Sequence, residues 1–163
     1  MTDGSRASGR VVGIFVAPRP SSPVEGRSEV RAVEGRGLEG DRYLTGTGTW
    51  SATPGTGRQM TLIEREAVEE LRSRDGIDLR PEELRRNIVT EGVALEELVG
   101  REARVGEVII RGMRLCEPCA HIESLTHPGV VKGLIHRAGL RADIVAGGTI
   151  RVGDPIALVA GEG

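Results

Sequence analysis

The residues that could do chemistry most directly lie at positions 115–121, in the sequence LCEPCAH. This segment contains both cysteines of the chain, Cys116 and Cys119, and also His121, one of three histidines. It follows an apolar, strand-like run at residues 108–115 and precedes an expected helix. Backbone N–H groups at a helix N-terminus stabilise a thiolate, the form of cysteine that attacks electrophiles and binds metals. The segment is therefore the first candidate for a functional site.

The C-x-x-C spacing fits four interpretations. A thioredoxin-like redox pair agrees with the order strand–CEPC–helix, but in that fold the motif comes early in the chain. A structural zinc site would use Cys116, Cys119, His121 and either His127 or His136, without a second C-x-x-C to support it. Both thiols could instead be small buried apolar groups. The fourth interpretation is a single reactive or metal-ligating thiolate, and spacing alone leaves the four open.

Two polar clusters are further candidates. Arg85, Arg86 and Asn87 precede an expected strand, where guanidinium and amide groups suit a phosphate or a carboxylate. Two solvated arginines and an asparagine in a turn would give the same spacing. Gly40 and Asp41 lie in the segment RGLEGDR at residues 36–42, which resembles a glycine-rich phosphate loop but lacks the Lys-Ser/Thr of a P-loop. Taken alone, that segment predicts only a tight turn.

Composition narrows the class of protein. The 163 residues carry a formal net charge of −2, with 22 Lys and Arg interleaved among 24 Asp and Glu, so nothing favours nucleic-acid binding. Phe15, Tyr43 and Trp50 are the only aromatic residues, too few for a base-stacking platform. No run approaches the roughly 20 apolar residues that cross a bilayer. Two cysteines without a signal-like N-terminus favour a reducing compartment, and we expect a cytoplasmic protein.

Apolar patterning predicts a mostly β (α+β) fold with a few peripheral helices. Strands are expected at residues 10–17, 30–33, 60–63, 87–90, 103–105, 107–115, 140–146, 149–152 and 156–159. Helical segments are expected at residues 64–74, from Pro81, at residues 95–99 and at residues 128–137. The pair Gly147-Gly148 predicts a tight hairpin between two of the closing strands. We expect a disordered N-terminus at residues 1–9, a long loop at residues 43–59, and a single domain over residues 10–163.

Four segments in this order resemble one family. They are GLEGDR at residues 37–42, LRRNIV at residues 84–89 with Gly92, EPC at residues 117–119, and the closing stretch from Gly147-Gly148 to Gly153-Asp154. Together they resemble the MOSC domain, which is named for the C-terminal part of molybdenum-cofactor sulfurases. The resemblance runs from about residue 10 to the end of the chain. It implies a barrel-like β domain with peripheral helices, in agreement with the patterning.

The resemblance implies a function for Cys119, which matches the family's key cysteine. In some members that cysteine carries sulfur as a persulfide, supplied by a pyridoxal-phosphate-dependent desulfurase. Pyridoxal phosphate would then belong to this partner, and no tightly bound pyridoxal phosphate is expected here. A molybdoenzyme is the alternative partner. In other members the cysteine ligates the metal of the molybdenum cofactor (molybdopterin). Cys116 has no match in many relatives and would either resolve a persulfide or pack in the core.

The resemblance also implies a cofactor-binding set. Arg85 and Asn87 match residues that hold the pterin phosphate in cofactor-binding relatives, and Arg86, Gly40 and Asp41 complete the candidate set. The chain departs from the family pattern at residues 46–49, where GTGT replaces a His-Gly-Gly. We also expect no additional N-terminal barrel of the kind found in larger relatives, so tight burial of the cofactor would need a partner or a homodimer.

The leading hypothesis is therefore a MOSC protein that handles sulfur or the molybdenum cofactor through Cys119. A non-catalytic binding module for the cofactor, or for another phosphate-bearing ligand, is the competing class. A redox or zinc protein built on the C-x-x-C is the third.

Overall fold

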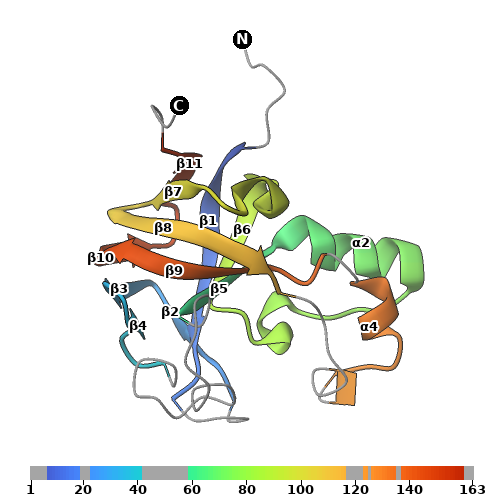
Figure 1. Cartoon of the computed structure of the whole chain (residues 1–163). Helices are drawn as coiled ribbons and strands as arrows, with labels where there is room; N and C mark the ends of the chain where they lie inside the picture. The colour runs from blue at the N-terminus through green and yellow to red at the C-terminus, as the bar shows by residue number, and fades with distance from the viewer. Residues whose placement is uncertain are drawn as a thin grey trace.

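Strands close on one another to form a barrel in the computed structural model of the chain (Figure 1). The structure describes residues 7–18, 23–41, 59–116, 123–124, 126–134 and 137–159. Within these residues seven strands form the barrel wall, because the last strand pairs with the first. In order around the wall they are β1 (Ala7–Val16), β6 (Ile88–Val93), β5 (Met60–Glu64), β9 (Leu140–Ala146), β8 (Val108–Leu115), β7 (Glu102–Val105) and β11 (Pro155–Leu158).

The strand pairing is antiparallel except between β5 and β6, which run parallel. A parallel pair needs a crossover connection, and the helix α2 (Arg65–Asp75) supplies it here. An additional strand, β2 (Glu25–Arg27), pairs with the C-terminal end of β1, whereas β11 pairs with its N-terminal end.

Apolar side chains from every wall strand fill the barrel. Strand β9 illustrates the pattern, because Leu140, Ala142 and Ile144 are buried while the alternate residues are less so. Successive side chains of a strand point to opposite faces, so this alternation places one face of β9 in the core and the other outside. The interior cluster contains aliphatic residues and one methionine, as the scarcity of aromatic residues requires.

A second apolar cluster lies outside the barrel, beneath the helices. Ile63 of β5 and Val89 of β6 point outward and pack with Val68 and Leu71 of α2. The short helix α4 (Val130–Gly133) adds Val130 to the same cluster. Figure 1 shows α2 and α4 together on one side of the barrel. The helices thus cover the outer faces of the parallel strands β5 and β6.

Two 3₁₀ turns and a small sheet complete the architecture. The turns are η1 (Pro81–Leu84) and η2 (Leu95–Leu98). The small sheet contains β3 (Glu29–Val33), flanked by β10 (Gly148–Arg151) and β4 (Gly37–Leu38). The expected hairpin at Gly147-Gly148 is wrong, because β9 pairs with β5 and β8 whereas β10 pairs with β3. The two glycines instead let the chain pass from the barrel to the small sheet.

The structure confirms the mostly β fold and most of the expected elements. Three differences have local causes. Strand β1 begins at Ala7, because Ser8 and Gly9 pair with β11, so residues 7–9 belong to the wall rather than to a disordered end. Residues 25–27, where no strand was expected, form β2. Of the helix expected at residues 128–137, the described part forms only the four residues of α4. Within the described ranges, no helix combines the length and apolar character that a membrane span requires.

Candidate functional site

Gly40 and Asp41 form a turn that brings a carboxylate into the protein. The backbone N–H of Asp41 donates to the carbonyl of Leu38 at 3.1 Å, and Gly40 has φ +87°, which favours glycine. The Asp41 side chain is buried, and its Oδ1 accepts hydrogen bonds from the Ala17 N–H at 2.9 Å and from Asn87 Nδ2 at 3.2 Å. The predicted tight turn is therefore present, and it brings residue 41 into contact with residue 87.

Asn87 lies at the centre of this contact and is buried. Its Nδ2 donates to the Phe15 carbonyl at 3.1 Å as well as to Asp41. Its Oδ1 accepts from the Thr61 N–H at 3.0 Å and from the Thr61 hydroxyl at 3.2 Å. A side-chain amide has two N–H donors and two acceptor lone pairs, so protein groups occupy all four positions. In this structure Asn87 ties β1, β5 and the residue-41 turn together.

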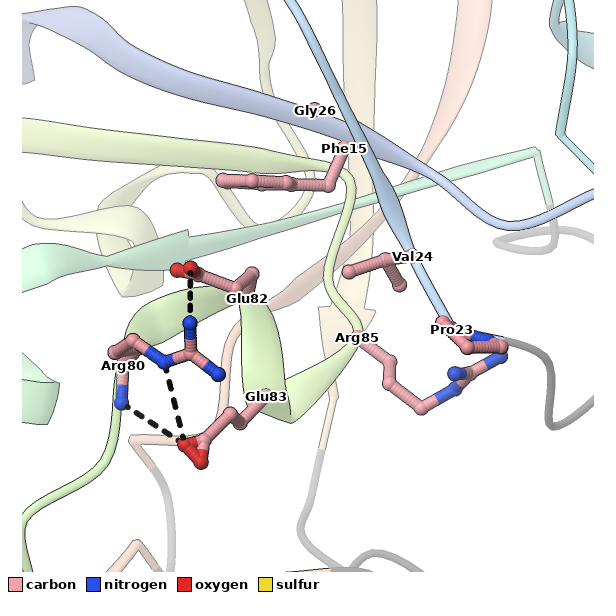
Figure 2. A pocket seen from close by; sticks show the side chains of 8 residues that line it. All are labelled: Phe15, Pro23, Val24, Gly26, Arg80, Glu82, Glu83 and Arg85. Carbon is pink, nitrogen blue, oxygen red and sulfur yellow. Dashed lines mark hydrogen bonds and ion pairs between the residues drawn. The ribbon is translucent and has the colours of Figure 1, made fainter.

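The two preceding arginines point in different directions. Arg86 is buried, and its Nε donates to the Ala138 carbonyl at 2.8 Å. Arg85 has the left-handed conformation with φ 62°, the only described non-glycine residue at positive φ. Its side chain borders a cavity of about 460 Å³ between β2 and η1 (Figure 2). The three residues of the cluster predicted from sequence therefore have three different surroundings, and their expected role in binding a phosphate stays a prediction.

The end of β8 is fixed by a contact to Gly139. Cys116 is a buried, free thiol, and its backbone N–H donates to the Gly139 carbonyl at 2.7 Å. Gly139 has φ +123°, and a Cβ at this position would lie 2.2 Å from the Leu62 carbonyl oxygen. Only glycine fits there. Cys119, which follows this fixed point by three positions, lies outside the described residues, as does His121.

An ion-pair cluster holds the loop that contains Gly139. Arg137 donates to Glu70 at 2.9 Å and to Glu64 at 3.3 Å, and Glu64 also accepts from the Leu95 N–H at 3.0 Å. Partial burial works against the charge of Arg137, but the hydrogen bond and charge of Glu70, together with those of Glu64, outweigh it and raise the pKa of Arg137. Two neighbouring residues of this loop are thus fixed: residue 137 by its own ion pairs, and Ala138 by the hydrogen bond from Arg86.

Arg141 is a candidate that the sequence did not indicate. The pairing of neighbouring strands places four polar residues side by side: Asn87, Thr61, Arg141 and Arg114. The Nη1 atom of Arg141 is buried and has no hydrogen-bond partner among the described residues. A buried N–H without a partner costs free energy, so this N–H could donate to an anion with little competition from protein groups. An arginine at an alternating position of an apolar strand looks like an ordinary exposed residue, which is why sequence reasoning missed it.

A zinc site gains no support from the part of the chain that the structure describes. Within it, no group of three or more His, Cys, Asp and Glu side chains could hold a metal ion. His127 is described, and its Nδ1 lies 2.6 Å from the carbonyl oxygen of Pro128. Cys116 of the expected zinc set is a buried free thiol, whereas Cys119, His121 and His136 lie outside the described ranges.

Comparisons with known proteins give one matching family model and several similar folds. The model of the MOSC domain matches residues 49–157. The YuaD protein of Bacillus subtilis has a similar structure, with a TM-score of 0.76 and 17% identity, over 91% of this chain and 94% of that one. YiiM of Geobacillus stearothermophilus (TM-score 0.69, 14% identity, 93% and 75% of the two chains) and YiiM of Escherichia coli (0.62, 18%, 93% and 70%) are also similar. No curated protein matches the sequence.

Proposed function

The chain belongs to the MOSC domain family, and we propose that it handles sulfur or the molybdenum cofactor through the thiol of Cys119. The observation that carries the proposal is the convergence of the family motifs. Asp41 contacts Asn87, and Arg86 contacts the loop at Ala138 that fixes the start of the Cys116–Cys119 segment. Segments far apart in the sequence are thus brought into contact, and one of these contacts lies at the loop that fixes Cys116.

In this proposal the two cysteines have different roles. Cys116 is 1% exposed and free, so we assign it to packing. A thiol must be reachable to accept sulfur or to ligate a metal on a cofactor. That requirement excludes a buried thiol as the first acceptor and leaves Cys119, the only other cysteine.

Two guanidinium groups of the described residues suit an anionic cofactor. Arg141 offers a buried Nη1 without a hydrogen-bond partner among the described residues, and Arg85 offers a second guanidinium. Guanidinium groups bind phosphates well, whereas a soft thiolate suits molybdenum. The donor set therefore fits the molybdenum cofactor, whose metal would supply two-electron redox chemistry when bound. We propose that Arg141 and Arg85 attract its phosphate, while Asn87 and Asp41 position the surrounding backbone.

Sulfur transfer to Cys119 would need no net oxidation or reduction. The Cys119 thiolate attacks the outer sulfur of a donor persulfide. A new S–S bond forms on Cys119, the S–S bond of the donor breaks, and the donor leaves as a thiolate. A pyridoxal-phosphate-dependent cysteine desulfurase is the class of donor that we propose, so pyridoxal phosphate would act in the partner. A molybdoenzyme is the corresponding partner for cofactor transfer, and a homodimer would provide further burial for the cofactor.

The test is metal and mass analysis of the protein purified gently from its own host. The proposal predicts molybdenum with a pterin, or one additional sulfur of about 32 Da, and either should be absent from Cys119→Ala. Cys116→Ala is the matched control and should keep the metal or the sulfur. A protein that carries zinc, or that carries neither molybdenum nor sulfur, would contradict the proposal.

The binding-module alternative predicts a different pair of results. If the chain only binds the cofactor, Cys119→Ala should keep affinity while Arg141→Gln and Arg85→Gly lose it, because the phosphate contact would supply most of the attraction. If Cys119 is the metal ligand, all three variants should lose the cofactor, whereas if Cys119 is the sulfur acceptor, only Cys119→Ala should lose the bound sulfur.

A further inference from the structure

Strand β2 has a strand partner on one side only. Among the described residues it pairs with β1, and no strand lies along its other edge. All the residues of β2, Glu25–Arg27, are exposed. An open strand edge presents backbone N–H and C=O groups to which another strand can add. The edge of β2 is therefore a candidate surface for association.

The pairing with β1 determines which backbone groups of β2 point to the open edge. Gly26 lies directly opposite Phe15. The Phe15 N–H donates to the Asn87 carbonyl at 2.7 Å and the Phe15 carbonyl accepts from Asn87 Nδ2, so both groups point away from β2. Phe15 and Gly26 therefore form a non-hydrogen-bonded pair, in which the N–H and C=O of Gly26 point away from β1. The Arg27 side chain donates to the Gly26 carbonyl at 3.3 Å, which leaves that oxygen a second lone pair.

The charged residues of β2 flank Gly26. Glu25 and Arg27 lie on one face of the strand, since side chains two residues apart share a face, and their Oε1 and Nη2 atoms are 2.8 Å apart. Charged residues on an edge strand usually oppose pairing with another strand. The order Glu-Gly-Arg has the opposite effect when two copies pair antiparallel about Gly26. Glu25 of each copy then lies directly across from Arg27 of the other, and opposite charges at such positions stabilise a sheet.

From this open edge and its charge pattern we infer that β2 pairs with β2 of a second copy of the chain. The two strands form an antiparallel ladder centred on Gly26, in which the Gly26 N–H of each copy donates to the Gly26 carbonyl of the other. A two-fold contact uses the same surface on both copies, and Glu-Gly-Arg is complementary to itself in this arrangement. Because so short a strand makes a small contact, the dimer should be weak, with a Kd on the order of 10–100 μM.

The contact lies beside the candidate site. The Arg27 Nη2 atom is 3.8 Å from the position that a Cβ would take at Gly40, in the turn that brings Asp41 into the protein. Self-pairing of β2 therefore gives the homodimer of the proposed function a surface. The pairing needs neither the Cys119 thiol nor a cofactor, so it extends beyond that function.

The test is sedimentation analysis of the full chain between about 10 μM and 1 mM, with charge-reversal variants. The natural chain should dimerise in this range. Glu25→Arg and Arg27→Glu should each weaken the dimer at least about tenfold, because like charges then face each other across the two strands. The double variant with both substitutions should dimerise again, since every Glu faces an Arg. A natural chain that stays monomeric up to about 1 mM would overturn the inference.

Mixing the two single variants gives the sharpest result. In a pair formed by one Glu25→Arg chain and one Arg27→Glu chain, each charge faces its opposite, so the mixture should form the heterodimer that neither variant forms alone. Arg104→Glu is the matched control, because Arg104 is exposed on β7, which pairs with β8 and β11, and this variant should dimerise as the natural chain does. A dimer that persists in both single variants, or a mixture that stays monomeric, would refute the pairing.

A second pair of variants tests the backbone contact at Gly26. Gly26→Pro removes the outward N–H, which an edge strand tolerates, and should weaken the dimer at least about tenfold. Gly26→Ala keeps the N–H, and its Cβ would lie 3.5 Å from the Phe15 ring, an ordinary contact, so it should dimerise normally. Equal dimerisation of the two variants would contradict the ladder.

Cys119→Ser distinguishes this inference from the proposed function. The variant should dimerise as the natural chain does while it loses sulfur or molybdenum. A natural chain that dimerises through β2 but carries neither sulfur nor molybdenum would refute the proposed function alone. A chain that carries either species but stays monomeric would refute the β2 contact alone.

Discussion

Two arginines on either side of Gly139 have opposite surroundings. Arg137 donates to Glu70 and Glu64 at 2.9 and 3.3 Å, and its side chain is 28% exposed. Arg141 is four residues further on, and its Nη1 is buried without a hydrogen-bond partner among the described residues. Carboxylates of the protein compensate the charge of Arg137, whereas the Nη1 atom of Arg141 has no acceptor among the described residues.

The difference separates structural charge from charge that a ligand could use. A paired guanidinium holds a loop, and here the loop supplies the carbonyl that binds the Cys116 N–H. A buried N–H without an acceptor lowers stability by about 1–3 kcal/mol. Such a group contributes to function only if something else supplies the acceptor. Asn87 belongs with Arg137 in this comparison, because protein groups use all of its hydrogen-bonding positions.

The largest expected effect is therefore that of Asn87→Ala. It would remove the partners of the Thr61 N–H and the Phe15 carbonyl and would leave the Asp41 carboxylate with one donor fewer. We expect a loss of about 3 kcal/mol or more in the free energy of unfolding, measured by urea denaturation. A loss below about 1 kcal/mol would mean that Asn87 is available for a ligand, as the family resemblance implied.

Arg137→Met should have the next largest effect. The aliphatic stem is kept, but Glu64, whose side chain is 10% exposed, loses its cation. We expect a loss of about 1–2 kcal/mol in the free energy of unfolding, with faster amide exchange at residue 116. Arg72→Met is a suitable control, because Arg72 is 64% exposed and lies 3.9 Å from Asp78. Equal effects of the two substitutions would show that the ion pair does not hold the loop.

Arg141→Met should change stability little, or raise it by up to about 1 kcal/mol, because it removes the unpartnered N–H. The same variant should lose molybdenum and pterin when it is purified from the host. This combination would sharpen the comparison between the two arginines. If Arg141→Met destabilises as much as Arg137→Met and keeps its cofactor, Arg141 is structural and the comparison fails.

The smallest effect is expected for an exposed pair, Glu107 and Arg151, which lie 3.2 Å apart. A hydrogen bond from the Thr149 N–H, and then one from Arg151, hold the pKa of Glu107 below its usual value. Its contribution to stability is therefore present above the ordinary carboxyl pKa and is lost as the pH falls through the lowered one. Glu107→Gln should be slightly less stable than the natural chain at neutral pH and equally stable in acid. A difference that persists at about pH 2 would contradict this assignment.

Local patterning was sufficient for most of the fold. The helix expected at residues 64–74 is α2, and the strands at residues 60–63 and 140–146 are β5 and β9. Pairing between distant segments was not predictable in the same way. Nothing local tells that β10 joins β3 rather than β9, since that choice depends on contacts more than 100 residues apart. The strand β2 escaped prediction because its three residues are all exposed and show no alternation.

The candidate site was predictable as a set of segments but not as a set of roles. The ordered motifs brought Gly40, Asp41 and Asn87 to notice, and the structure brings Asp41 and Asn87 into contact. Their expected role in cofactor binding stays a prediction. The opposite directions of Arg85 and Arg86 depend on the left-handed turn at Arg85, which spacing does not reveal. Burial of Cys116 likewise follows from the end of β8 and not from the C-x-x-C spacing.

The most direct test of the central claim compares single-cysteine variants as sulfur acceptors. The natural chain, Cys116→Ala and Cys119→Ala would each be incubated with a cysteine desulfurase and isotopically labelled cysteine, then analysed as intact proteins by mass spectrometry. The account predicts one labelled sulfur on the natural chain and on Cys116→Ala, and none on Cys119→Ala. Label on Cys119→Ala, or equal loss of label in both variants, would contradict the assignment of Cys119 as the functional thiol and Cys116 as a packing residue.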